Sequence, residues 1–123
     1  MRTIMVIVQV VAALGLLNVW LLRFHKRTAY RGGDAGSMRE EFVAYGLPGW
    51  FAMVIGALKV GVALALIAGI WLPALVLPAA ALLTVLMLGA LAMHAKIHDP
   101  LVKFAPALGM LLLALCLVWG AQR

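Results

Sequence analysis

A lysine in the middle of an uncharged stretch is the residue of this sequence best suited to do chemistry. Lys59 lies in the apolar run from Gly49 to Trp71, roughly ten residues from either end and therefore about 15 Å deep in a bilayer. A charge at that depth costs roughly 2.5–3.5 kcal/mol on insertion scales and often marks a functional site. All four acids lie outside the apolar runs, so we expect no carboxylate at its level. Either Lys59 binds an anionic or carbonyl-bearing ligand such as a quinone, or it is satisfied by helix ends, water or a partner subunit.

Three uncharged polar residues lie in the neighbouring apolar runs and could complete such a site. Thr84 lies midway along its run, at the depth of Lys59, and Gln9 and Asn18 flank that level in the first run. Hydroxyl and amide groups can exchange hydrogen bonds with a ligand that carries carbonyl oxygens. We therefore predict Lys59, Thr84, Gln9 and Asn18 as the ligand-binding residues.

Two histidines are the candidates for a metal site. His94 and His98 are four residues apart, and they share one helical face if the helix extends that far. With Asp99 they could ligate a metal, since imidazole is a common ligand. Polar residues at the end of a membrane span explain the pair equally well, and no third ligand is certain. We therefore predict no metal site and keep the two histidines as weak candidates.

Motifs of enzymes are missing from the sequence. There is no Gly-rich phosphate loop, no hydrolase nucleophile elbow and no pair of facing carboxylates. Cys116 is the single cysteine, so the chain cannot run a thiol–disulfide relay alone. The seven methionines are scattered and are interpreted as packing residues. We predict no catalytic residue, and whether the protein belongs to an enzyme stays open.

The amino-acid composition indicates that the candidate site residues lie within a membrane protein. The chain is 67% hydrophobic and 11% charged, whereas soluble domains are about 45–50% apolar and about 25% charged. A small soluble fold cannot bury so much apolar surface, so the excess must face lipid. The net charge of +6 comes largely from bases beside the apolar runs, which is typical of membrane topology signals. It does not indicate a nucleic-acid partner.

Four apolar runs are long enough to cross a bilayer as helices. The sequence predicts an all-α fold, a bundle of four transmembrane helices with a short interfacial helix between spans 1 and 2. We expect one membrane domain over residues 1–123, with spans at about 3–22, 49–71, 74–94 and 101–121. A cleaved signal peptide is the alternative for the first run. The run is longer than the apolar part of a signal peptide and ends in Arg23, which favours a retained helix.

The polar connection at residues 23–48 contains the predicted short helix. Its glycines indicate a loop at 31–36, and Ser37 and Glu40 have the spacing of a capping box. Met38, Phe42 and Tyr45 recur at helical spacing. This apolar stripe fits a helix that lies in the membrane interface, or an ordinary surface helix.

Charge and tryptophan positions predict the topology. Trp20 and Trp50 fall at one interface, and Trp71 and Trp119 fall at the other, as aromatic belts require. Most bases lie in the 1–2 and 3–4 connections: Arg23, Lys26, Arg27, Arg31, Arg39, Lys96 and Lys103. By the positive-inside rule these connections are cytoplasmic and both termini lie outside, in a bacterial cytoplasmic membrane.

Small residues recur every four positions in the second span, at Ala57, Gly61, Ala65 and Gly69. Such a stripe allows two helix backbones to approach closely. It indicates either a seam between two copies of the chain or contact with a neighbouring helix of the same chain.

Several short motifs resemble the DoxX-like family of small four-helix membrane proteins. They are Glu41-Phe42, Tyr45-Gly46-Leu47-Pro48, Gly56-Ala57-Leu58-Lys59, Gly89-Ala90, His94, Asp99-Pro100 and Pro106-Ala107. The resemblance covers about residues 10–120 and implies the four-helix fold. Many relatives carry a glutamate where this chain has Lys59, so a mechanism assigned to that acid does not transfer. The family is named after a subunit of a quinone-coupled thiosulfate-oxidising complex, and other relatives resemble assembly factors.

Three functions fit these observations, and we predict the first, with the other two as alternatives. The first is an accessory subunit or assembly factor of a membrane complex, which acts through helix packing. The second is a quinone-binding component of a membrane oxidoreductase, with quinone as the cofactor near Lys59. The third is a small transporter, which must form an oligomer because four helices hardly enclose a wide path. The expected partners are lipid and either other membrane subunits or further copies of the chain.

Overall fold

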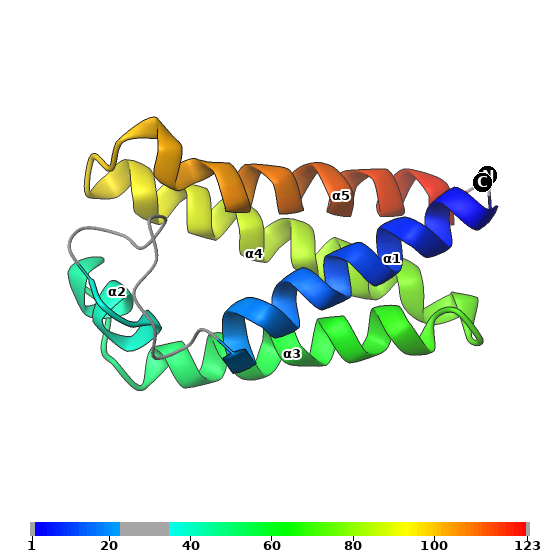
Figure 1. The fold of residues 1–123 in the computed structure, drawn as a ribbon, viewed down its shortest axis with the longest axis horizontal. Helices are drawn as coiled ribbons and strands as arrows, with labels where there is room; N and C mark the ends of the chain where they lie inside the picture. The colour runs from blue at the N-terminus through cyan, green and yellow to red at the C-terminus, as the bar shows by residue number, and fades with distance from the viewer. Residues whose placement is uncertain (1, 23–34, 123) are drawn as a thin grey trace.

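The computed structural model describes residues 2–22 and 35–122, which form a bundle of four long helices with a short helix at one end (Figure 1). The long helices are α1 (Arg2–Leu17), α3 (Phe51–Ala68), α4 (Val76–Lys96) and α5 (Ala105–Ala121), and α2 (Met38–Ala44) is the short one. Three short helical segments extend them: Asn18–Leu22, which is π-helical, and the 3-10 turns Pro73–Leu75 and Leu101–Phe104. These ranges contain no strand, and the predicted all-α bundle is confirmed.

All four long helices are long and apolar enough to span a membrane. Their membrane-compatible stretches are Thr3–Leu22, Phe51–Ala68, Pro73–Lys96 and Leu101–Ala121. Their outward surfaces carry large apolar side chains such as Leu14, Val85 and Leu112, which lipid must cover. The second span is shorter than predicted because Trp50 is the N-cap of α3 and the chain turns after Ala68. The chain is an integral membrane protein.

Small side chains bring the long helices together. Ala12, Ala63, Ala80 and Ala114 have no exposed surface, and each long helix contributes one of them. Leu66, Leu83 and Leu117 are the largest fully buried side chains and fill the space between these alanines. Without a hydrophobic drive in lipid, such close packing is what holds membrane helices together.

The predicted small-residue stripe of α3 divides between two environments. Gly69 is buried against Val76 and Gln9, whereas a Cβ on Gly61 would meet no atom within 4 Å. Gly56, which lies off the stripe, is buried against the Trp20 ring. Contact within the chain therefore accounts for the end of the stripe near Gly69, and its middle faces outward.

Helix α2 is capped as the sequence predicts. Ser37 Oγ accepts a hydrogen bond from Glu40 N at 3.2 Å, and Glu40 Oε2 accepts one from Gly36 N at 2.7 Å. Gly46 ends the element with a φ of 85°, a conformation that glycine adopts without strain. The beginning of the predicted glycine loop and the bases from Arg23 to Arg31 lie outside the described residues.

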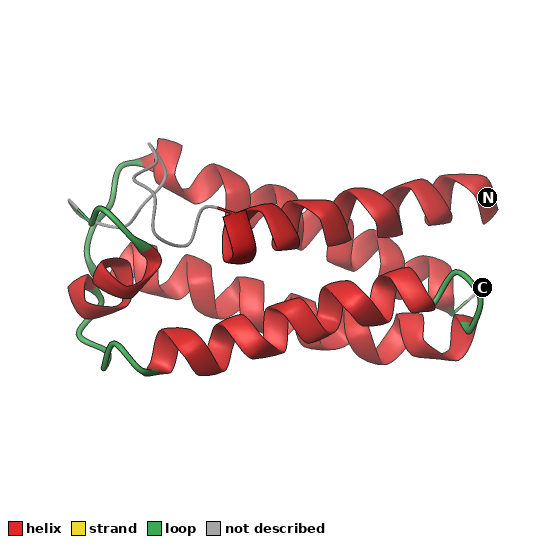
Figure 2. Ribbon diagram, turned by 60° about the horizontal axis from the view of Figure 1, so that its bottom comes forward, coloured by secondary structure: helices red, strands yellow, loops and turns green. Residues whose placement is uncertain are grey.

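Helix α2 packs across the end of the bundle. Its apolar residues Met38 and Phe42, with Tyr45 beyond them, are buried in a second cluster with Trp20 and Ala52. Trp20 was expected in an aromatic belt, but it is 5% exposed because α2 covers it. Figure 2 shows that the described loops gather at the two ends of the bundle, with the start of α1 and the end of α5 at the end away from α2.

Candidate ligand-binding site

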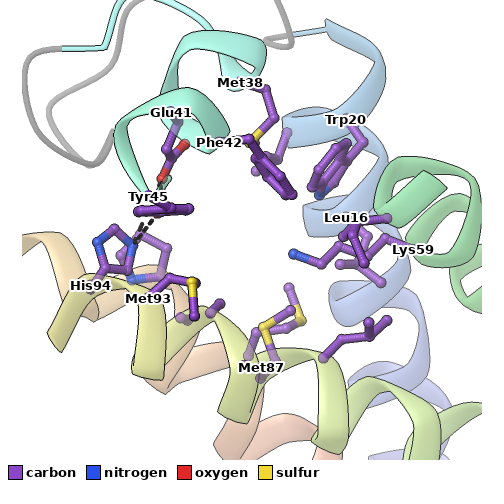
Figure 3. Close-up of a pocket in the computed structure, with 18 of the residues that line it drawn as sticks. Leu16, Trp20, Met38, Glu41, Phe42, Tyr45, Lys59, Met87, Met93 and His94 are labelled. Atoms are coloured by element: carbon purple, nitrogen blue, oxygen red, sulfur yellow. Dashed lines mark hydrogen bonds and ion pairs between the residues drawn. The ribbon is translucent and has the colours of Figure 1, made fainter. Parts of the chain in front are cut away.

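A cavity of about 810 Å³ lies at the α2 end of the bundle, within the range of about 300–1,000 Å³ that is typical of small-molecule sites. All five α-helices contribute to its walls. The walls are mostly apolar, and Met38, Met87, Met93 and Met110 are among them. Four of the methionines that appear scattered in the sequence thus gather around one space, as Figure 3 shows for three of them.

Lys59 brings a positive charge to one side of this cavity. Its side chain extends from α3 with the nitrogen toward the open space (Figure 3), and the residue is only 9% exposed. Nζ lies 4.9 Å from the centroid of the Trp20 ring, a distance at which the ring face attracts a cation. Within residues 2–22 and 35–122, no hydrogen bond or ion pair to Nζ is formed. A ligand in the cavity would therefore meet an ammonium group with donors available.

Glu41 brings a carboxylate to the opposite side, and its charge attracts that of Lys59. Glu41 is 6% exposed, and its Oε1 accepts a hydrogen bond of 2.5 Å from the Tyr45 hydroxyl. The two residues are four apart, so α2 and the turn that follows it present both to the cavity. The sequence analysis did not anticipate a carboxylate in the same cavity as Lys59. It assumed that a connection stays outside the bundle, whereas α2 folds onto it.

His94 links this carboxylate to the end of the bundle. Its Nε2 lies 3.4 Å from Tyr45 Oη and 3.8 Å from Glu41 Oε1. Its Nδ1 lies 2.7 Å from Asp99 Oδ2, and the Phe104 ring packs against it at 5.4 Å between centroids. A carboxylate beside Nδ1 favours a proton on that nitrogen.

The neighbouring lysines hold this cluster together. Lys96 Nζ donates a 2.8 Å hydrogen bond to the carbonyl oxygen of Tyr45, which ties the end of α4 to the turn after α2. Lys103 Nζ lies 3.9 Å from Asp99 Oδ1. Buried carboxylates require such partners, because an isolated charge away from water is costly.

Only two of the four predicted ligand-binding residues line the cavity. Lys59 and Asn18 do so. Gln9 instead donates a 2.9 Å hydrogen bond to the carbonyl oxygen of Leu66, which ties α1 to α3. Thr84 donates to the carbonyl oxygen of Ala80 one turn earlier in its own helix, at 2.8 Å. For Gln9 and Thr84 the structure therefore shows bonds within the bundle and no place in the cavity wall.

The two histidines do not share a helical face. Helix α4 ends at Lys96, and His98 has a φ of 56° in the exposed turn that follows, so its side chain cannot continue the row of His94. Across the described part of the chain, no three His, Cys, Asp or Glu residues are grouped so as to hold a metal ion.

Glu41, Tyr45 and Trp20 are site residues that the sequence analysis missed. Glu41 and Tyr45 were judged only as parts of a surface helix, and Trp20 only as a belt residue. Two features pointed to them: Glu41 and Tyr45 are four residues apart, and both belong to the motifs shared with the DoxX-like family. Glu41 lies off the stripe of Met38, Phe42 and Tyr45, so the helical spacing alone did not place it in the cavity.

The arrangement is suited to hold an uncharged ring compound between opposite charges. The apolar wall would contact the ring, and the ammonium and carboxylate groups would hydrogen-bond polar atoms on its two sides. His94 and Asp99 stand behind the carboxylate.

Comparison with known proteins agrees with the architecture. Neither the curated proteins nor the solved structures give a match to the chain. Residues 34–119 match the DoxX-like family, and this range contains α2 to α5 with Glu41, Lys59, His94 and Asp99. The match covers more than half of the sequence, and this protein therefore belongs to the DoxX-like family.

Proposed function

We propose that this protein binds a lipid-soluble quinone in the cavity beside α2 and serves as the quinone-binding component of a membrane oxidoreductase. The observation that carries this proposal is the Lys59 ammonium group, which faces an apolar cavity and is opposed by Glu41. A quinone has a flat apolar ring for the walls and carbonyl oxygens that accept hydrogen bonds from Lys59. Its reactive oxygens would lie away from lipid.

The energetics favour a ligand over a purely packing role for Lys59. The charge costs roughly 2.5–3.5 kcal/mol at mid-bilayer, and the contact with the Trp20 ring returns about 0.5–2 kcal/mol. A methionine would fill the same volume without the cost. A ligand that accepts hydrogen bonds from the Lys59 ammonium group explains why a lysine occupies this position beside the cavity.

The other two functions receive less support from the geometry. An accessory subunit or assembly factor needs neither the cavity nor the opposed charges, although a quinone-binding component would also assemble with other subunits. Transport through a single chain conflicts with the packed core, because Leu66, Leu83 and Leu117 are fully buried at the centre of the helices. A path would have to run between copies of the chain.

The orientation follows from the same proposal and from the distribution of charge. Lys96 and Lys103 lie at the α2 end, and bases near span ends favour the cytoplasmic side. We place the α2 end and the mouth of the cavity toward the cytoplasm of a bacterium, and both termini outside.

Fluorescence of Trp20 provides the test, because its ring borders the cavity. Decylubiquinone is titrated into the purified protein in lipid nanodiscs. We expect saturable quenching that Trp20→Phe abolishes and Trp119→Phe retains, since Trp119 is exposed on the last helix, α5. Quenching that only follows the partition of quinone into lipid, and that is equal in both variants, would refute the proposal.

The Lys59→Met variant adds an independent arm. Loss of a charge-assisted hydrogen bond weakens quinone binding by about tenfold or more, while the thermal stability stays equal or rises because a buried charge is removed. Arg39→Met removes a positive charge from the exposed face of α2 and serves as the matched control. Unchanged quinone affinity in Lys59→Met, with the yield of a native complex reduced, would favour the accessory-subunit function instead.

A further inference from the structure

We infer that Lys59 forms a covalent imine with a lipid-soluble aldehyde that enters the cavity. The inference goes beyond the proposed function, because it concerns a reactive amine and a second class of ligand. It does not require the cavity to bind a quinone. It rests on the position of the Lys59 nitrogen and on the apolar walls around it.

The Lys59 amine is positioned to react. Its nitrogen points into the open space of the cavity (Figure 3), although the residue is only 9% exposed. The lysines nearby are engaged: Lys96 Nζ donates to the carbonyl oxygen of Tyr45, and Lys103 Nζ lies 3.9 Å from Asp99 Oδ1. Within the described part of the chain, Lys59 Nζ forms no such bond or ion pair. A lysine withdrawn from water into an apolar pocket is the kind of amine that forms Schiff bases with carbonyl compounds.

The walls of the cavity suit the rest of such a molecule. The space of about 810 Å³ is lined by methionines and by the rings of Trp20 and Phe42. A long hydrocarbon chain gains free energy by lying against such walls. An apolar lining also limits the access of water, which would otherwise hydrolyse the imine. The ligand class is therefore an aldehyde on an apolar chain.

The reaction balances without a further reactant. The nitrogen lone pair attacks the carbonyl carbon and forms the C–N bond, while the carbonyl π electrons move to the oxygen. Protons from the nitrogen pass to this oxygen, which leaves as water when the C=N bond forms. Counted from the ammonium form, two of its three protons leave in the water and the third stays on the imine nitrogen. Nothing is oxidised or reduced.

The product keeps the positive charge, so the groups that attract the Lys59 ammonium also stabilise the protonated imine. Nζ lies 4.9 Å from the centroid of the Trp20 ring, and a ring face attracts a cation at this distance. The charge of Glu41 attracts that of Lys59 as well. Both groups therefore favour the protonated imine over the neutral one.

Reductive trapping on the wild-type chain tests the inference. The protein in lipid nanodiscs is incubated at neutral pH with dodecanal and cyanoborohydride, which reduces an imine to a stable amine, and peptide mass spectrometry locates the product. We expect Lys59 to be labelled at least about tenfold faster than exposed Lys96, because the cavity concentrates the aldehyde beside an amine withdrawn from water. Equal labelling of the two lysines, or none at Lys59, would overturn the inference and leave the proposed function standing. Labelling of Lys59 without saturable quenching by decylubiquinone would support the inference and refute the proposed function.

All-trans-retinal adds a spectroscopic readout, because a protonated imine of this conjugated aldehyde absorbs at longer wavelength than the aldehyde itself. We expect the long-wavelength band in the wild type and its loss in Lys59→Arg, which keeps the positive charge but cannot form an imine. Arg39→Lys adds an amine on the exposed face of α2 and should leave the band unchanged. Thermal unfolding checks that Lys59→Arg is folded, and the mapping on the wild type does not depend on this variant. A band of equal size in folded Lys59→Arg would show that another amine forms the imine and would overturn the inference.

Discussion

A pair of glycines on α3 measures how tightly this helix packs against Trp20 beside the cavity. A Cβ added at Gly56 would lie 2.7 Å from Trp20 Cε3 and 3.0 Å from Cζ3, whereas one at Gly61 would meet no atom within 4 Å. Both glycines lie within α3, so Gly56→Ala and Gly61→Ala change the intrinsic helix propensity by the same amount. The difference between the two variants therefore isolates the contact with Trp20.

The magnitude follows from how little the Trp20 ring can move. It is buried and packs edge to face on Phe42, with 6.1 Å between centroids and 80° between the planes. Inserting a methyl group against such a ring costs about 1–3 kcal/mol, and alanine regains about 1 kcal/mol of helix propensity over glycine. Gly56→Ala should thus range from neutral to about 2 kcal/mol destabilising, while Gly61→Ala should stabilise by up to about 1 kcal/mol.

Equilibrium unfolding in mixed micelles, with dodecyl sulfate as the denaturant, measures both free energies under one condition. We expect the two variants to differ by about 1–3 kcal/mol, and Trp20 emission to shift in Gly56→Ala alone. A difference below about 0.5 kcal/mol would mean that Trp20 does not lie against Gly56. The arrangement of Trp20 beside Lys59 would then be wrong as well.

Two further predictions concern the α2 end of the bundle. Ser37→Ala removes the acceptor for Glu40 N and should cost roughly 0.5–2 kcal/mol locally, measured as faster hydrogen exchange over residues 38–44; unchanged exchange there would contradict the capping role. Cysteines placed at exposed His98 and Gln122, in a Cys116→Ala background, should be labelled from opposite faces of intact membrane vesicles. Labelling of both from one face would contradict the four-span topology.

The fold was largely predictable because the lipid bilayer restricts which structures an apolar segment can form, and apolar segments are recognised from composition. Twenty or so apolar residues in a row have few structures open to them in lipid, and the runs ending at Leu22 and Ala121 coincide with helix ends. Helix α2 was predictable from its cap at Ser37 and its apolar stripe. The end of α4 was not predictable in this way. No helix-breaking residue lies among His94, Ala95 and Lys96, so α4 continues to Lys96 before the chain turns at His98.

The site was predictable only where the polarity of a residue differs from that of its neighbours in the sequence. Lys59 stands out because a charge within an apolar run requires an explanation, and the structure places it beside the cavity. Thr84 was predicted as a ligand-binding residue only from its depth in the membrane. Its hydroxyl instead bonds the preceding turn of its own helix, and depth in the membrane does not predict which way a hydroxyl bonds. Glu41 was not predicted as a site residue, because acidic residues are common in polar connections. Its role became visible only when α2 was seen to fold onto the bundle. Such a contact is long-range and leaves no periodic pattern.

The methionines of the cavity wall have a consequence for the range of ligands. Met38, Met87, Met93 and Met110 come from three different helices, and each side chain has three rotatable bonds and a polarisable sulfur. Such a lining adapts its shape to the molecule it surrounds, as calmodulin does with its many target helices. The substituents on a ring would therefore be accommodated by rotation of thioether chains. Discrimination between ligands would rest with the ammonium and carboxylate groups, whose positions the surrounding rings hold.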